Sequence, residues 1–166
     1  MPLDNVSEHS TELENIIDRL IELNNRKQGV SDDIKEVKNE AKAMGFEVPI
    51  IMEVIKIRAM DHGEYDEYRE MVAMYRNAIG FPIDESVSYE GVDGSESELN
   101  SFVERLERLL QENKDIAEDI KEVKTEAKGL GFEPKMVALC VKIKEKGTQD
   151  IDERDQMIEL YRAAVA

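Results

Sequence analysis

The stretch that decides the fold is DIKEVKTEAKGLGFE at residues 119–133, which repeats DIKEVKNEAKAMGFE at residues 33–47. Extended outward at a constant offset of 86 residues, the match aligns 12–80 with 98–166 without a gap, and 25 of the 69 aligned positions are identical. A long offset that occurs only twice indicates a duplicated domain, because repeat arrays have periods of about 20 to about 50 residues. We therefore expect an N-terminal arm at 1–11, a first copy at 12–80, an acidic linker at 81–97 and a second copy at 98–166.

Each copy opens with apolar residues whose spacing alternates strictly between four and three. The stripe of copy 1 is Ile16, Leu20, Leu23, Lys27, Val30, Ile34, Val37, Ala41 and Met44, and that of copy 2 is Phe102, Leu106, Leu109, Asn113, Ile116, Ile120, Val123, Ala127 and Leu130. A 3.5-residue period over about four heptads predicts a coiled-coil helix about 50 Å long in each copy. The polar residues Lys27 and Asn113 stand at the same place in the two stripes; they fix the pairing register or, for Lys27, reach to solvent.

Breaks in the pattern predict two shorter helices after each long one. Gly45 and Gly131 follow the last stripe residues and suit a helix end, while Pro49 and Pro134 suit the first turn of the next helix. A third segment in each copy again shows apolar spacings of three and four, and no strand-like alternation is visible. The fold class is therefore all-α, with a long coiled-coil helix followed by two shorter helices, twice. Pairing of the long helices within one chain and pairing between chains both remain open.

Composition excludes several classes of protein. The 166 residues carry 38 acidic and 22 basic side chains, a formal net charge of −16, with a single Cys. An internal disulfide is thus impossible, no apolar run approaches the roughly 18 residues of a membrane span, and no secretion signal is visible, so we expect a cytoplasmic protein. His9, His62 and Cys140 form no metal-ligand spacing, and Cys140 is expected to be a buried core thiol. We expect no metal, no cofactor, no small-molecule substrate and no enzymatic activity.

The acidic charge is unevenly distributed along the chain. Segments 34–60 and 120–146 carry net charges of +1 and +3, which leaves −20 on the other 112 residues. Their basic residues are Lys35, Lys38, Lys42, Lys56 and Arg58 in copy 1, and Lys121, Lys124, Lys128, Lys135, Lys142, Lys144 and Lys146 in copy 2. The first three in each set share one helix side, which is either a solvated face paired with Glu residues or a surface for the phosphate backbone of double-stranded DNA. The scarcity of Arg argues against bidentate base readout.

At these residues the sequence resembles the GapR-like nucleoid-associated proteins of bacteria. The resemblance rests on DIKEVKTEAKGLGFEPKMVALCVKIKEK at 119–146 with the coiled coil before it, and on the same pattern in copy 1. It implies dimers that assemble into a tetramer, and DNA held in a basic cleft. It also implies a preference for AT-rich, overtwisted DNA contacted through the backbone and the narrow minor groove.

The resemblance also assigns individual residues. The family's basic positions correspond to Lys35, Lys42, Lys56 and Arg58 in copy 1, and to Lys121, Lys128, Lys142 and Lys144 in copy 2. Lys38 and Lys124 are additional charges where the family commonly has an aromatic. Neither copy has the dense basic run that usually follows in the family, and copy 1 also departs from it at Pro49 and Glu53. We therefore expect weak, salt-sensitive binding, with copy 2 the stronger half.

These observations support a leading hypothesis and two alternatives. The leading one is an architectural DNA-binding protein of the bacterial nucleoid, whose fused copies act as a covalent pseudo-dimer and whose chains form a homodimer. Its oligomer seam is predicted at Ile16, Leu20, Leu23, Phe102, Leu106, Leu109 and Asn113. The first alternative is an acidic interaction module that hetero-oligomerises with a basic GapR-like DNA binder or antagonises it. The second is a plain helical dimerisation scaffold.

Overall fold

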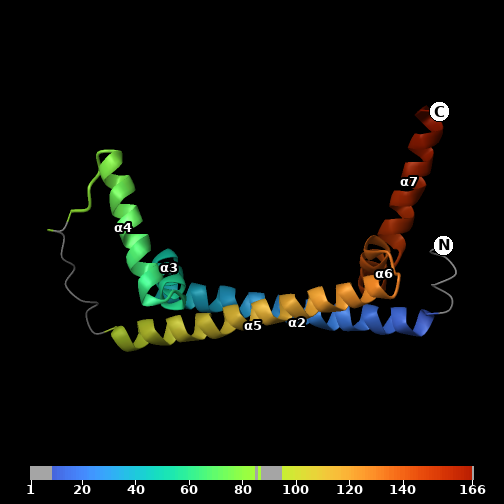
Figure 1. Ribbon diagram of the computed structural model, residues 1–166. Helices are drawn as coiled ribbons and strands as arrows, with labels where there is room; N and C mark the ends of the chain where they lie inside the picture. Colours follow the sequence, from blue (N-terminus) through green and yellow to red (C-terminus); the bar gives the residue numbers. More distant parts are fainter. Residues whose placement is uncertain (1–8, 85, 87–94, 166) are drawn as a thin grey trace. The chain divides into compact units, whose positions relative to one another are not determined.

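The computed structural model describes residues 9–84, 86 and 95–165, and these residues form helices without any strand (Figure 1). The helices are α2 (Ser10–Ala43), α3 (Val48–Ala59), α4 (His62–Ala78), α5 (Glu96–Gly129), α6 (Pro134–Lys146) and α7 (Gln149–Val165). The predicted all-α fold, a long helix followed by two shorter helices in each copy, is confirmed. Residues 1–8 of the predicted arm and residues 85 and 87–94 of the predicted linker lie outside the described residues.

The chain divides into two compact units that cut across the sequence repeat. Unit 1 combines Met1–Val30 with Glu112–Ala166, and unit 2 is Ser31–Gln111. Each unit therefore contains one part of α2 and one part of α5. The basic segment of copy 1, residues 34–60, lies in unit 2, and that of copy 2, residues 120–146, lies in unit 1.

In unit 1 the first part of α2 packs antiparallel against the last part of α5. Two ion pairs fix this register, Arg19 to Glu126 and Arg26 to Glu112, each with a nitrogen–oxygen distance of 2.8 Å. The buried residues of unit 1 come from both long helices, the turn after α5, α6 and the start of α7: Ile16, Ile17, Leu20, Val30, Ile116, Ile120, Val123, Ala127, Phe132, Val137, Val141 and Ile151. Cys140 is half-buried, not fully buried as expected, because Val137 and Val141 occupy the inward face of α6.

Unit 2 repeats this arrangement with the other parts of the long helices. Arg105 on α5 bonds to Glu40 on α2 at 2.8 Å, and this hydrogen bond raises the pKa of Arg105 above its usual value. Phe46, which follows α2, meets Phe102 edge to face with ring centroids 5.7 Å apart. The buried residues are Ile34, Val37, Ala41, Ile51, Phe102, Val103 and Leu106.

Both long helices end in the way that their glycines predict. Gly45 and Gly131 have φ values of 89° and 85°, in the left-handed region that favours glycine. The amides of Phe46 and Phe132 donate to the carbonyls of Ala41 and Ala127, each at 3.0 Å, which closes a Schellman motif at each end. Pro49 and Pro134 then stand in the first turns of α3 and α6, as expected.

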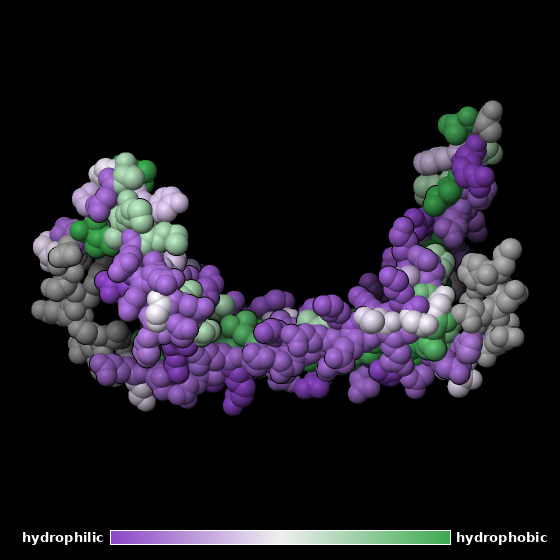
Figure 2. Space-filling view, viewed as in Figure 1, coloured by the Kyte–Doolittle hydropathy of each residue, from purple (hydrophilic) through white to green (hydrophobic). Residues whose placement is uncertain are grey.

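The third helices, α4 and α7, are packed far less than the rest of their units. No residue of α4 is buried, and in α7 only Ile151 is. Figure 1 shows that α4 projects away from α3 and that α7 projects away from α6. Figure 2 shows hydrophobic residues on the visible surfaces of α4 and α7. The spacing of apolar residues thus predicted both helices correctly, but it did not indicate whether their apolar faces are buried against other helices.

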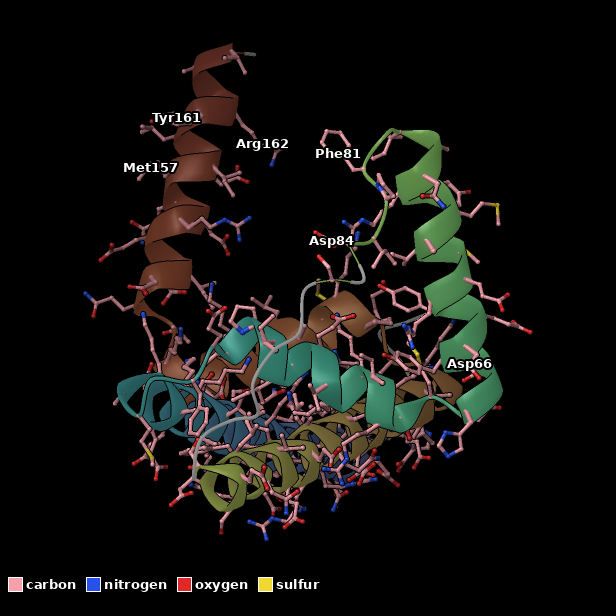
Figure 3. All side chains as sticks on the ribbon, turned by 90° about the vertical axis from the view of Figure 1, so that its left-hand side faces the viewer. Asp66, Phe81, Asp84, Met157, Tyr161 and Arg162 are labelled. Carbon is pink, nitrogen blue, oxygen red and sulfur yellow. The ribbon has the colours of Figure 1, made fainter. Side chains whose placement is uncertain are left out.

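The apolar faces of α4 and α7 match position by position at the 86-residue offset. Their exposed fractions are 51% and 52% for Met71 and Met157, and 66% and 62% for Tyr75 and Tyr161. In Figure 3 Met157 and Tyr161 point to the same side of α7, and Arg162 points to the other side. We call these surfaces the terminal faces; they comprise Met71, Val72, Met74 and Tyr75 on α4 with its C-cap residue Ile79, and Met157, Ile158, Leu160, Tyr161 and Val165 on α7.

Candidate nucleic-acid interface

In unit 2 most of the predicted DNA-binding residues are already engaged by carboxylates. Lys35 bonds to Asp32 at 2.9 Å and Lys56 to Glu53 at 3.3 Å, each three residues away on the same helix. Arg58 on α3 reaches Glu107 on α5 at 3.2 Å. Half-buried Lys38 and exposed Lys42 make no ion pair with any described residue. Within the described part of the chain, copy 1 therefore offers two of its five candidate cations free of an ion pair.

In unit 1 most of the predicted DNA-binding residues make no ion pair with a described residue. All seven candidate lysines are exposed, three on α5 and four on α6. Lys144 bonds to Asp18 on α2 at 2.5 Å, and it is the one member of this set that has an ion pair within the described residues. The other six are Lys121, Lys124, Lys128, Lys135, Lys142 and Lys146. Copy 2 thus presents most of the uncompensated positive charge.

A groove in unit 1 brings lysines from two helices together. Lys124 of α5 and Lys142 of α6 line a hollow of about 250 Å³. Leu20, Val137 and Val141 are among its apolar lining residues, and Glu145 lines it as well. Apolar walls support the lysine stems, and the two ammonium groups stay available to an anion such as phosphate.

Unit 2 contains a larger hollow of a different character. It has a volume of about 470 Å³ and lies between α3, the turn before it and the start of α5. Phe46, Ile50, Ile51, Val54, Leu99 and Val103 supply its apolar lining, with Glu47, Glu96, Asn100 and Arg58 as its polar residues. Because Arg58 is the single cation there and is paired with Glu107, this hollow does not suit a phosphate backbone.

The predicted seam residues line the contact between the long helices. Ile16, Leu20, Phe102 and Leu106 are at most 3% exposed, and Leu23, Leu109 and Asn113 are half-buried. The side-chain oxygen of Asn113 is buried and accepts no hydrogen bond from the described part of the chain.

Sequence reasoning allowed for Glu residues paired with the lysines, but it named none of the four carboxylates that bind basic residues in the structure. The Asp32 and Glu53 partners could have been found, because a carboxylate three residues before a lysine shares its helix side. The Asp18 and Glu107 partners could not, because they depend on how α2 and α5 pack against α6 and α3.

Among the described residues, no cluster of three or more His, Cys, Asp or Glu side chains could hold a metal ion. In the same residues, no helix combines the length and the apolar character needed to cross a bilayer.

Comparison with known families decides what these repeated basic helices are. The model of the GapR-like DNA-binding domain matches the chain twice, at residues 9–80 and 95–166. The chain belongs to this family. The tandem GapR-like organisation expected from the sequence is thereby confirmed, and membership of a DNA-binding family supports DNA as the partner and a non-enzymatic role.

Relatives of this GapR-like protein are about as long as one copy. The UPF0335 protein of Azospirillum brasilense is 41% identical over 68 residues, which cover 41% of this chain and 83% of the relative. The UPF0335 protein of Mesorhizobium japonicum is 43% identical over 68 residues, with coverages of 41% and 79%. The UPF0335 protein of Methylobacterium nodulans is 38% identical over 80 residues, with coverages of 48% and 91%. No solved structure matches the chain.

Proposed function

We propose that this GapR-like chain binds double-stranded DNA through the sugar–phosphate backbone and the minor groove, without base-specific readout or with a preference for AT-rich DNA of a particular shape. In the cell it acts as an architectural protein of the bacterial nucleoid. The observation that carries the proposal is the state of the basic residues: eight of the twelve candidates make no ion pair with a described residue. A cation without a protein partner can neutralise a phosphate and release a counterion without first breaking an existing contact.

The chemistry of the free cations favours recognition of the backbone. All eight are lysines, whose ammonium groups act as point charges, while the one arginine of the set, Arg58, is occupied by Glu107. The bidentate arginine contacts that identify guanine in the major groove are therefore missing from the set. Sequence preference then arises from DNA shape and deformability.

The two copies contribute unequally to the proposed interface. Six of the eight free lysines belong to copy 2, in unit 1, and two belong to copy 1, in unit 2. Lys124 and Lys142 share one groove in unit 1, so phosphate contacts from α5 and α6 can fall on neighbouring nucleotides. We propose that copy 2 supplies most of the affinity.

Assembly completes the proposed function. The antiparallel packing of α2 on α5 supports a covalent pseudo-dimer of the two fused copies, and the predicted seam residues form its contact. The matched terminal faces of α4 and α7 support association of two chains into a homodimer of tandem chains, because exposed apolar surfaces of this kind mark interaction sites.

The test is fluorescence anisotropy with an AT-rich duplex at low salt. The wild-type chain is expected to bind, and replacing Lys121 and Lys128 together with Glu is expected to abolish binding. The matched control replaces Lys114 and Arg154 with Glu; both lie outside the basic segments, and the net charge changes by the same amount. Absence of wild-type binding at about 50 mM salt, or equal losses in the two double variants, would refute the proposal.

A second candidate function is favoured by the terminal faces together with the acidity of the chain. Outside segments 34–60 and 120–146 the chain carries −20, and α4 and α7 combine exposed apolar residues with acidic ones. Such helices suit a partner with an apolar stripe and basic flanks. The chain would then capture a basic single-copy relative and withhold it from DNA. Mixing the chain with such a relative and measuring both complex formation and the relative's DNA binding separates the two functions.

A further inference from the structure

Two residues at equivalent positions of the two copies face each other in unit 1. Arg26 and Glu112 are 86 residues apart, which is the offset of the repeat, and the Arg26 Nη2 atom lies 2.8 Å from Glu112 Oε1. At such a position, pairing of a long helix with another copy of itself would bring two identical residues together. Lys27 and Asn113, the polar residues of the two stripes, are the next equivalent pair along the chain.

The other two ion pairs between α2 and α5 do not join equivalent positions of the two copies. Arg19–Glu126 in unit 1 and Arg105–Glu40 in unit 2 are copies of each other, because Arg19 corresponds to Arg105 and Glu40 to Glu126. If the first long helices of two chains paired antiparallel, they would form the same ion pair between Arg19 and Glu40. Two second long helices would form it between Arg105 and Glu126. These pairs therefore do not distinguish one long helix from the other.

The repeated pairs Arg19–Glu126 and Arg105–Glu40 do distinguish antiparallel from parallel packing of the long helices. In a parallel arrangement in register, each residue faces its own equivalent, so Arg19 would face Arg105 and Glu40 would face Glu126. Like charges across a helix contact are unfavourable and set orientation in coiled coils. The repeated pairs thus specify direction, and a choice of partner has to come from elsewhere.

Arg26 and Glu112 can determine which long helix is accepted as the partner. Two first helices paired antiparallel would bring Arg26 against a second Arg26, and two second helices would bring Glu112 against a second Glu112. Asp119 and Glu22 also act on Arg26, but their contributions are the same with either partner, because Asp119 corresponds to Asp33 in copy 1 and Glu22 lies on α2 itself. Of the charges that act on Arg26, Glu112 is therefore the one that a like charge replaces when the first long helix meets another copy of itself.

We propose that the Arg26–Glu112 pair is a specificity determinant, which makes the first long helix accept the second and reject another copy of itself. The side chains are 57% and 37% exposed, so the attraction is modest and most of the discrimination comes from like-charge repulsion in the wrong pair. The inference rests on the proposed pseudo-dimer but not on DNA binding. It explains why the first long helix of one chain does not pair with the first long helix of another chain, and why two second long helices do not pair either.

The experiment reads out seam pairing by disulfide formation in the full chain. Cys140 is replaced by Ser, and Lys27→Cys places a thiol next to position 26, so that an interchain disulfide reports that the first long helices of two chains are in contact. Four samples are oxidised under the same conditions: the reporter alone, reporter with R26E, reporter with E112R, and an equimolar mixture of the last two refolded together. In the mixture, position 26 is acidic in the R26E chain and can face the unchanged Arg26 of the E112R chain.

The mixture is expected to give several-fold more interchain disulfide than either variant alone, and the reporter alone is expected to give little. A mixture no different from its components, or strong crosslinking of the reporter alone, would overturn the proposal. The matched control is the double swap R26E/E112R, which restores opposite charges within the chain and should fold and behave like the reporter alone. Strong crosslinking of the double swap would also overturn the proposal. Because no DNA is present, a chain that fails to bind DNA can still pass this test.

Discussion

Neutralising the three α5 lysines of copy 2 should weaken DNA binding more than neutralising the three α2 lysines of copy 1. The comparison sets K121Q/K124Q/K128Q against K35Q/K38Q/K42Q, two variants with the same change in net charge at equivalent positions. The copy 2 lysines are all free of ion pairs within the described residues, while Lys35 is held by Asp32 at 2.9 Å. The structure therefore predicts unequal losses from identical changes.

The magnitude follows from counterion release. Each lysine that neutralises a phosphate contributes about 0.9 to the slope of log K against log salt. The copy 2 variant should lower that slope by up to about 2.7, and the copy 1 variant by about 1.8, because one of its lysines is occupied. Over a threefold range of salt, the difference of about 0.9 means that the affinity loss of the two variants on adding salt differs by roughly 2.7-fold.

The assay is fluorescence anisotropy with one AT-rich duplex, titrated at several salt concentrations from about 50 to about 150 mM. The slopes of the wild type and both variants are compared, and circular dichroism verifies that helix content is unchanged. Equal slopes for the two variants, or a larger decrease for the copy 1 variant, would show that ion pairing in the free protein does not govern which lysines contact DNA.

Three further predictions concern the fold. Leu106→Ala removes a side chain that is 0% exposed, and it should lower the free energy of unfolding by about 2–5 kcal/mol in a urea titration, with a smaller loss arguing that the site collapses. Gly45→Ala forces a Cβ onto a residue with φ of 89° and should cost about 1–2 kcal/mol, while Gly29→Ala, in the open interior of α2, should stabilise by about 0.5–1 kcal/mol. Thermal melts of this glycine pair should move in opposite directions. Asp61→Ala removes the capping box made with Glu64 at the start of α4 and should cost about 0.5–2 kcal/mol, seen as lost helix content or a lower melting temperature.

The sequence was most informative where one physical cause acts over many residues. A heptad stripe is repeated so often that Ile16, Leu106 and Ile116 could be assigned to the apolar side of the long helices from the sequence alone, and all three are almost completely buried. The glycine that ends each long helix was equally readable, because few residues besides glycine tolerate a positive φ.

Direction, register and neighbours were not readable in the same way. A heptad pattern identifies which side of a helix is buried, but it does not say whether the partner helix runs parallel or antiparallel. The contact between Arg26 and Glu112 could therefore not be predicted from the sequence. The apolar spacing of Met71 and Met157 looks like that of a packed face, yet both are about half exposed. Periodicity reports the face of a helix and carries no information about what covers it.

The candidate interface was predicted in outline but not in strength. Charge partition identified the basic segments, and the structure then distinguished occupied from free cations. Lys144 and Arg58 illustrate the difference, since each pairs with a carboxylate on another helix. Such pairs depend on tertiary register, which no local pattern in the sequence encodes.

The division into units has a consequence for synthesis on the ribosome. Unit 2 is one continuous stretch, Ser31–Gln111, and can close as soon as it has emerged. Unit 1 joins the two ends of the chain, so the apolar side chains of Ile16, Ile17 and Leu20 must wait for α5 and α6 before they are covered. In the interval this early segment is exposed to neighbouring nascent chains and to chaperones. The start of α2 is thus translated before α5 and α6 but is buried only after both have emerged.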